Sequence, residues 1–130
     1  MMAARALRTL ALLWLLAPLW LALWGSPLAS AAPPPTFLSN LEDVPLMPGL
    51  AERRDLAISF DKPEGRIVEA VAEGRMSQGE VAKFYAATLP QLGWKGIGAN
   101  RFAREGEELL LNFTAAPNRL TVRFALSPRR

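Results

Sequence analysis

The stretch SQGEVAKFYAATLPQLGW, residues 77–94, decides the fold, because it carries the clearest helical pattern in the chain. Ser77 and Glu80 have the spacing of a capping box, in which the serine hydroxyl accepts a hydrogen bond from the third helical amide and the carboxylate reaches back to the cap amide. Apolar side chains then recur every three or four residues on one helical stripe: Val81, Phe84, Tyr85, Thr88, Leu89 and Leu92. Gly93 is well placed to end the helix in the left-handed conformation. The sequence therefore predicts a helix over about residues 78–92.

Two strand-like segments precede this helix. Leu56, Ile58 and Phe60 alternate with smaller or polar residues, which predicts a half-buried strand. The turn-forming sequence DKPEG at 61–65 follows, and residues 66–73 alternate again. The sequence therefore predicts a β-hairpin before the helix.

Four more strand-like segments follow the helix, separated by short turns rich in Gly, Asn and Pro. They cover residues 94–97, 101–104, 109–115 and 120–126. Strands joined by short turns pair antiparallel. We therefore predict an α+β domain over residues 52–127, with a single antiparallel sheet of about five to six strands in β-β-α-β-β-β-β order and one helix packed across one face.

The N-terminal residues have the order of a secretory signal peptide. Two arginines precede the apolar run from Leu10 to Trp24, and small residues follow it. Ala29 and Ala31 supply the A-x-A pattern that signal peptidase requires, so cleavage leaves Ala32 as the first residue. We predict that residues 1–31 are a signal peptide. An uncleaved N-terminal anchor is the alternative, since the apolar run is near the lower length limit of a membrane span.

Two further segments flank the predicted domain. Residues 32–51 contain repeated prolines, which block helices and central strands, so this segment is expected to be a tether or an arm docked on the domain. Residues 128–130 form a short basic tail. A signal peptide on a small domain without disulfides favours the bacterial envelope, so we predict a periplasmic protein, or one anchored in the inner membrane and facing the periplasm.

The composition excludes several kinds of chemistry. The chain has 130 residues with no His and no Cys, so imidazole and thiolate groups are absent from any site. Removal of the predicted leader takes away Arg5 and Arg8, and the formal net charge falls from +3 to +1. Export and a nearly neutral mature chain argue against nucleic acid as a partner. We predict no catalytic residues, no cofactor and no metal site.

Three weak motifs are explained by structure rather than chemistry. Ser59 and Lys62 match the S-x-x-K pattern of some serine hydrolases, but they lie between a strand and a turn and the companion motifs are missing. The glycines of 93–98 are accounted for by a helix end and a hairpin turn. The carboxylates of the strands and turns stand near arginines and lysines, as solvated charges do. A small hydrolase that uses carboxylates or lysine remains the least favoured alternative.

One cluster of arginines is a candidate interaction surface. It comprises Arg101, Arg104, Arg119 and Arg123, which the predicted strands bring near one another. Such a positive stripe can meet an anionic surface or lipid phosphate. A membrane contact of any other kind is expected only through the leader, if it is retained.

The sequences PEGRIVEAVAEG, FYAATLPQLGW and FAREGEELLL together resemble a family of small, uncharacterised secreted or periplasmic proteins of proteobacteria. These proteins share an F-Y-x-x-x-L-P-x-x-G-W helix ending, which Phe84, Tyr85, Leu89, Pro90 and the Gly-Trp pair that follows match here. The resemblance covers about residues 43–127. It implies a helix on an antiparallel sheet, and it implies no particular activity.

These observations predict a non-catalytic binding or accessory domain of the envelope. Its partner is expected to be an envelope protein, reached through the exposed sheet face, a sheet edge or the proline-rich arm. The alternative is a carrier of a lipid or another small apolar ligand. That alternative rests on Ala70, Ala72, Ala86 and Ala87, which are expected to leave a gap between helix and sheet.

Overall fold

The structure is a computed structural model that describes residues 28–130; most of the expected signal peptide lies outside the described residues. The expected cleavage residues Ala29, Ala31 and Ala32 are exposed and have no regular secondary structure. Residues from Pro34 to Arg130 form one compact unit. Among residues 28–130, no helix is both long enough and apolar enough to cross a membrane.

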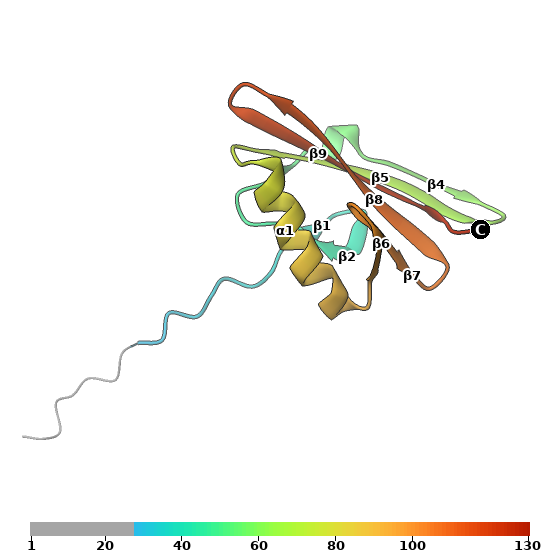
Figure 1. Cartoon of the computed structure of the whole chain (residues 1–130), viewed down its shortest axis with the longest axis horizontal. Coiled ribbons are helices and arrows are strands. Elements are labelled where there is room, and N and C mark those ends of the chain that lie inside the picture. The colour runs from blue at the N-terminus through green and yellow to red at the C-terminus, as the bar shows by residue number, and fades with distance from the viewer. Residues whose placement is uncertain (1–27) are drawn as a thin grey trace, which may run out of the picture. The chain divides into compact units, whose positions relative to one another are not determined.

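Antiparallel strands make up most of the compact unit (Figure 1). The elements are β1 (Phe37–Leu38), β2 (Leu41–Pro45), β3 (Ala51–Glu52), the 3-10 turn η1 (Arg54–Leu56), β4 (Ile58–Lys62), β5 (Gly65–Gly74), α1 (Gln78–Thr88), the 3-10 turn η2 (Leu89–Leu92), β6 (Lys95–Gly98), β7 (Arg101–Arg104), β8 (Glu107–Ala116) and β9 (Arg119–Pro128). The fold is therefore α+β, with the predicted order of strands and helix between β4 and β9.

The main sheet has seven strands rather than the predicted five to six. Its order is β3-β5-β9-β8-β7-β6, and β4 pairs with β5 beside β3. The extra strand is β3. Residues 51 and 52 pair with the C-terminal end of β5, and β4 pairs with the N-terminal part of the same strand. β1 and β2 form a separate two-stranded sheet. The prolines of residues 32–51 leave such short strands without a clear sequence pattern.

The helix begins and ends for the predicted local reasons. Ser77 is the cap residue, and its side chain and that of Glu80 form the reciprocal capping box. The α-helical part stops at Thr88 and the last turn is 3-10, because Pro90 has no amide hydrogen to continue the i to i−4 pattern. Gly93 ends the turn at φ 88°, a left-handed conformation that glycine adopts without a side-chain clash.

The strand at residues 58–62 corrects the prediction of a half-buried strand starting at Leu56. Residues 54–56 form η1, and every residue of β4 is exposed. Pairing places Ile58 opposite Glu69 and Phe60 opposite Ile67, on the face of the sheet that does not carry Val68. Alternation shows which residues share a face, but it does not show whether that face meets the core.

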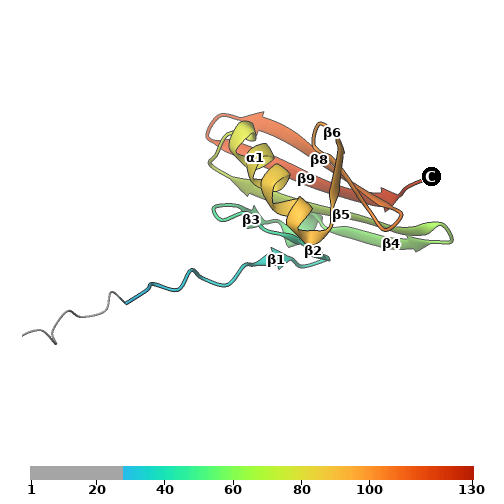
Figure 2. The same ribbon diagram turned by 60° about the horizontal axis from the view of Figure 1, so that its bottom comes forward.

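The hydrophobic core lies on one face of the sheet, which we call the inner face. This face carries alternate residues of the three long strands: Val68, Ala70 and Ala72 of β5, Leu109 and Leu111 of β8, and Val122, Phe124 and Leu126 of β9. Val81, Tyr85 and Leu89 of the helical segment belong to the same core. The Tyr85 ring meets the Phe124 ring edge to face at 5.2 Å between centroids. Figure 2 shows α1 on this side of the sheet.

The residues before β4 also contribute to this core. Leu38, Leu41, Val44 and Leu50 are buried in it. The Tyr85 hydroxyl donates a hydrogen bond to the Pro45 carbonyl at 2.8 Å and accepts one from the Met47 amide at 3.2 Å. The compact unit therefore begins well before the expected boundary at residue 52. At the other end, β9 includes Pro128, the first residue of the expected tail.

Candidate interaction surface

The opposite face of the sheet, which we call the outer face, carries ion pairs between neighbouring strands. The strand register places Glu69 and Glu73 of β5 on this face with Arg123 of β9. Arg123 pairs with Glu69 at 2.9 Å, and Glu73 receives Arg53 at 3.2 Å and Arg119 at 3.7 Å. Cross-strand pairs of opposite charge stabilise neighbouring strands modestly. The charged residues that alternate with the apolar ones along these strands therefore stabilise the outer face by ion pairs.

Three of the four predicted arginines lie on this outer face. They are Arg101, Arg119 and Arg123, and the strand pairing places Arg101 there beside Glu108, with which it forms an ion pair. Arg104 lies on the inner side instead, because it alternates with Arg101 and Ala103 along β7. All four arginines have a carboxylate within salt-bridge distance. The charge of the predicted stripe is therefore compensated locally.

Arg104 instead connects the N-terminal strands to the end of the helical segment. Its guanidinium lies 4.6 Å from the centre of the Trp94 ring, donates to the Leu92 carbonyl at 3.0 Å and pairs with Asp43 at 2.7 Å. Asp43 belongs to β2, so these contacts join segments far apart in the sequence. Long-range pairs of this kind leave no signal in local periodicity.

The pKa shifts on the surface follow from these ion pairs. Hydrogen bonds from Arg53 hold the pKa of the Asp55 carboxyl below its usual range. The Glu107 carboxylate raises the pKa of the Arg66 guanidinium, against the opposing effect of burial. In both cases the ion pair favours the charged form of the group.

The β4 edge is the most exposed apolar surface among the described strands; we define it as the open side of Ile58–Lys62 together with Leu56. Leu56, Ile58 and Phe60 are 45%, 49% and 46% exposed. Among residues 28–130, β4 pairs with β5 alone. Lys62 extends over the Phe60 ring, with 5.7 Å from its ammonium nitrogen to the ring centre. The sequence shows the apolar alternation of this edge but not its exposure.

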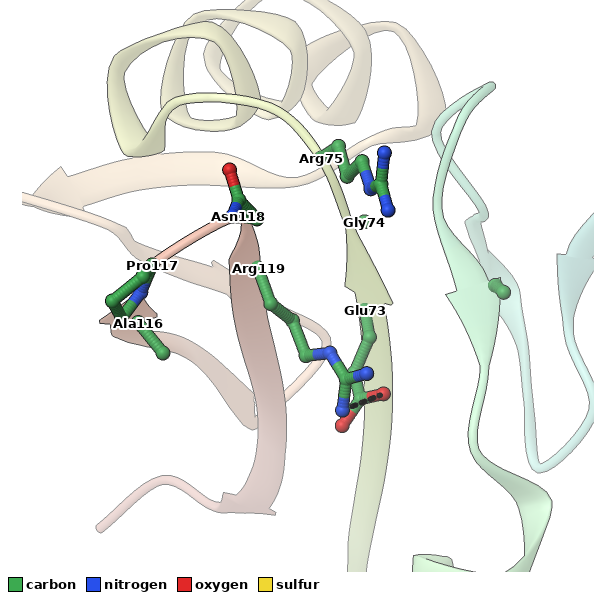
Figure 3. A pocket seen from close by; sticks show the side chains of 8 residues that line it. Glu73, Gly74, Arg75, Ala116, Pro117, Asn118 and Arg119 are labelled. Carbon is green, nitrogen blue, oxygen red and sulfur yellow. Dashed lines mark ion pairs between the residues drawn. The ribbon is translucent and has the colours of Figure 1, made fainter.

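A shallow, open cavity of about 470 Å³ lies between the end of β5 and the β8–β9 turn (Figure 3). Figure 3 shows Arg119 extending toward Glu73, with which it pairs, while Asn118 points away from that pair. Glu73 is the single carboxylate among the residues that line the cavity, and Arg53 and Arg119 both engage it. Hydrolysis by paired carboxylates needs two such groups across a cleft, which this cavity does not supply.

The other reactive groups considered are not assembled into a site. Ser59 and Lys62 lie on opposite faces of β4, since they are three residues apart on one strand. Burial raises the pKa of the Tyr85 hydroxyl far above its usual value, so this group stays protonated between its two backbone partners. Within the described part of the chain, no group of three or more acidic side chains is placed to hold a metal ion.

The alanines expected to leave a gap between helix and sheet do not lie together. Ala70 and Ala72 are buried in the core, whereas Ala86 and Ala87 are exposed on the side of the helix that faces away from it. Tyr85 and Phe124 fill the space between the two layers. This arrangement supplies no lining for an apolar ligand at that position.

The fold and surface thus define a class: a small α+β domain with a covered sheet face, an ion-paired face and one apolar strand edge. No protein-family model matches the chain, and neither a curated protein nor a solved structure matches it.

Proposed function

We propose that this chain is a non-catalytic binding or accessory domain of the bacterial periplasm that acts through protein–protein contact at the β4 edge. The observation that carries the proposal is that, among residues 28–130, β4 pairs on one side only, while Leu56, Ile58 and Phe60 of the β4 edge are exposed. The absence of His and Cys from the sequence, and the engagement of Glu73 by two arginines, argue in the same direction.

An open edge is suited to binding another strand. Its outward amides and carbonyls can hydrogen-bond to an added strand, and alternate side chains then select the partner. Proteins usually protect such edges with charged residues, prolines or covering elements. The β4 edge has the charged residues Asp61 and Lys62 at one end, and Ser59 together with the apolar Leu56, Ile58 and Phe60 over the rest, so its protection is partial.

The periplasmic location rests on the leader. Residues 1–31 have the pattern of a signal peptide, and the residues of the cleavage motif, Ala29 to Ala32, are exposed and have no regular secondary structure, which leaves them accessible to a peptidase. We expect export of the full-length chain and recovery of a form that begins at Ala32. N-terminal sequencing of protein from the periplasmic fraction tests this, and recovery of the uncut chain in the cytoplasmic fraction would contradict it.

Site-specific crosslinking in the periplasm tests the proposed contact. A photoreactive phenylalanine analogue is placed at Phe60 in the full-length chain, and a matched control carries it at Leu92, which is 37% exposed near the helix end. We expect crosslinks to protein from position 60 and few from position 92. Equal crosslinking at the two positions, or none at position 60, would count against the β4 edge as the contact.

A further inference from the structure

We propose that the β4 edge binds the β4 edge of a second copy of this chain. The two strands pair antiparallel about a twofold axis at Phe60 and join two sheets into one. This inference rests on the proposed function, because it names the partner of the same surface. It is carried by the backbone groups that the edge presents, by the side chains on each face, and by the charges at its end.

Strand pairing fixes which backbone groups of β4 are open. The Arg53 amide donates to the Val71 carbonyl at 2.7 Å, so the odd-numbered residues of β5 direct their amides and carbonyls toward β3 and β4. Their partners in β4 are Ile58, Phe60 and Lys62. The groups of these three residues are therefore used within the hairpin, and the amides and carbonyls of Ser59 and Asp61 face outward.

One register of self-pairing satisfies all of these outward groups. With Phe60 opposite Phe60, Ser59 of each copy lies opposite Asp61 of the other, and each such pair exchanges two hydrogen bonds. If the centre of the pairing shifts one residue toward the N-terminus, from Phe60 to Ser59, Asp61 lies opposite Ala57, whose amide already donates to the Arg54 carbonyl. If the centre shifts one residue toward the C-terminus, from Phe60 to Asp61, Ser59 lies opposite Pro63, which has no amide hydrogen.

The same register suits the side chains. On the outer face the two Phe60 rings meet at the axis, flanked on each side by Ile58 and by Lys62 of the other copy. Lys62 already lies over an aromatic ring in one copy, so the second ring offers the same contact. The C-terminal shift places Asp61 opposite Asp61, and directly opposed like charges destabilise a strand pair. Hydrogen bonding and charge thus select the same alignment.

The size of the contact sets its strength. Only five residues of each copy pair, and stable protein interfaces bury roughly 1,200–2,000 Å² in total. A five-residue edge falls below that range, so the dimer is weak and exchanges rapidly with the monomer. A partner that extends onto the outer face would bind more tightly and displace the second copy.

Sedimentation velocity of the protein as purified from the periplasm is the first test. We expect the average mass to rise with concentration toward that of a dimer, and Phe60→Lys to abolish the rise, because two lysines then meet at the axis. Leu92→Lys is the control, since it adds the same charge to an exposed leucine away from β4. A wild-type protein that stays monomeric at all concentrations would overturn the proposal, as would an equal loss in the control.

Cysteine substitution tests the register, because the natural chain has no cysteine. Opposed residues of a non-hydrogen-bonded pair have Cα atoms about 4.5 Å apart, within the roughly 4.4–6.8 Å that a disulfide spans. Under mild oxidation Phe60→Cys should form a covalent dimer at least several-fold faster than Ile58→Cys or Leu92→Cys. Equal rates at the three positions would overturn the twofold axis at Phe60.

The experiments distinguish a failure of self-association from a failure of the β4 edge as a protein contact. A photocrosslink from position 60 to a different protein, with a monomeric wild type in sedimentation, would reject the second copy and retain the β4 edge as a contact. A concentration-dependent dimer with crosslinks only between copies supports both. No crosslink from position 60 together with a monomeric protein rejects both.

Discussion

The two faces of the sheet are built from the same strands and are stabilised in different ways. Along β5, Val68, Ala70 and Ala72 are buried in the core of the inner face, while Glu69 and Glu73 alternate with them and form ion pairs on the outer face. Burial of apolar area is worth far more than exposed ion pairs. The inner face therefore supplies most of the stability of the fold, and the outer face and the β4 edge contribute less to it.

The largest difference between the faces is expected from adjacent residues of β9. Phe124→Ala removes a fully buried ring that contacts Tyr85, and large-to-small changes of this kind cost about 3–5 kcal/mol in the free energy of unfolding. Arg123→Ala is the matched control on the outer face, expected to cost less than about 1 kcal/mol. Urea unfolding of the two variants measures both. Similar losses would show that the outer face carries more of the fold than its contacts indicate.

A smaller loss is expected from the polar contact inside the core. Tyr85→Phe keeps the ring but removes the hydroxyl that joins Pro45 and Met47, and buried groups left without partners cost about 1–3 kcal/mol. We expect the loss to be local, with faster hydrogen exchange at the Met47 amide than in β5 and β9. Uniform acceleration across the sheet would show instead that the N-terminal strands and the main sheet unfold together.

The sequence predicts the parts of this molecule that local rules govern. The capping box at Ser77, the proline-shortened last turn and the glycine stop locate the helical segment within its predicted limits, and the order of strands after β3 follows from turn spacing. The exposure of the β4 edge could not be read locally, because Leu56, Ile58 and Phe60 have the alternation of an inward-facing strand. Pairing with β5 determines which face of the sheet Ile58 and Phe60 occupy. Because Val68 of β5 lies on the inner face, Ile58 and Phe60 lie on the outer face.

Long-range contacts explain the rest of what the sequence left open. Arg101, Arg104 and Arg123 lie on strands as predicted, and Arg119 is the first residue of β9 rather than part of the preceding turn. The carboxylate partners of these arginines come from positions up to 61 residues away, as with Arg104 and Asp43. Strand parity separates Arg104 from the other three, and parity depends on a register that turns alone do not fix. Whether these arginines bind a partner stays a prediction.

The helix cap is expected to contribute less than the buried hydroxyl of Tyr85. Ser77→Ala removes the acceptor of the Glu80 amide at 3.1 Å, and loss of a serine cap costs about 1 kcal/mol. Hydrogen bonds from Ser77 lower the pKa of Glu80 in the folded state. The stabilisation by this carboxylate is therefore complete above the ordinary pKa of 4.5 and is lost as the pH falls through the lowered value.

Thermal unfolding at several pH values checks the cap. We expect the difference between wild type and Ser77→Ala to shrink when the pH is taken below the folded-state pKa of Glu80. Gln78→Ala is a suitable control, because it lies in the same turn and takes no part in the capping box. A difference that stays constant down to acid pH would show that Glu80 does not depend on Ser77.

The outer-face ion pairs are expected to have the next smaller effect. A double-mutant cycle with Arg123→Ala and Glu69→Gln should give a coupling of about 0.2–1 kcal/mol, because both side chains are partly exposed to solvent. The coupling should decrease at high salt, which screens exposed charges. A larger coupling that is insensitive to salt would mean that the outer face is shielded from water in solution, as a bound partner would make it.

The smallest effect on stability is expected where the proposed effect on binding is greatest. Phe60 is 46% exposed on β4, and Phe60→Lys should change the free energy of unfolding by no more than about 0.5 kcal/mol, as surface substitutions generally do. The same change is expected to remove self-association, because it places a charge on the apolar part of the edge. Unfolding measures the contribution of Phe60 to the stability of the fold, and sedimentation measures its contribution to self-association. A loss of stability as large as that of Phe124→Ala would show that Phe60 supports the fold, and the distinction between the core and the β4 edge would fail.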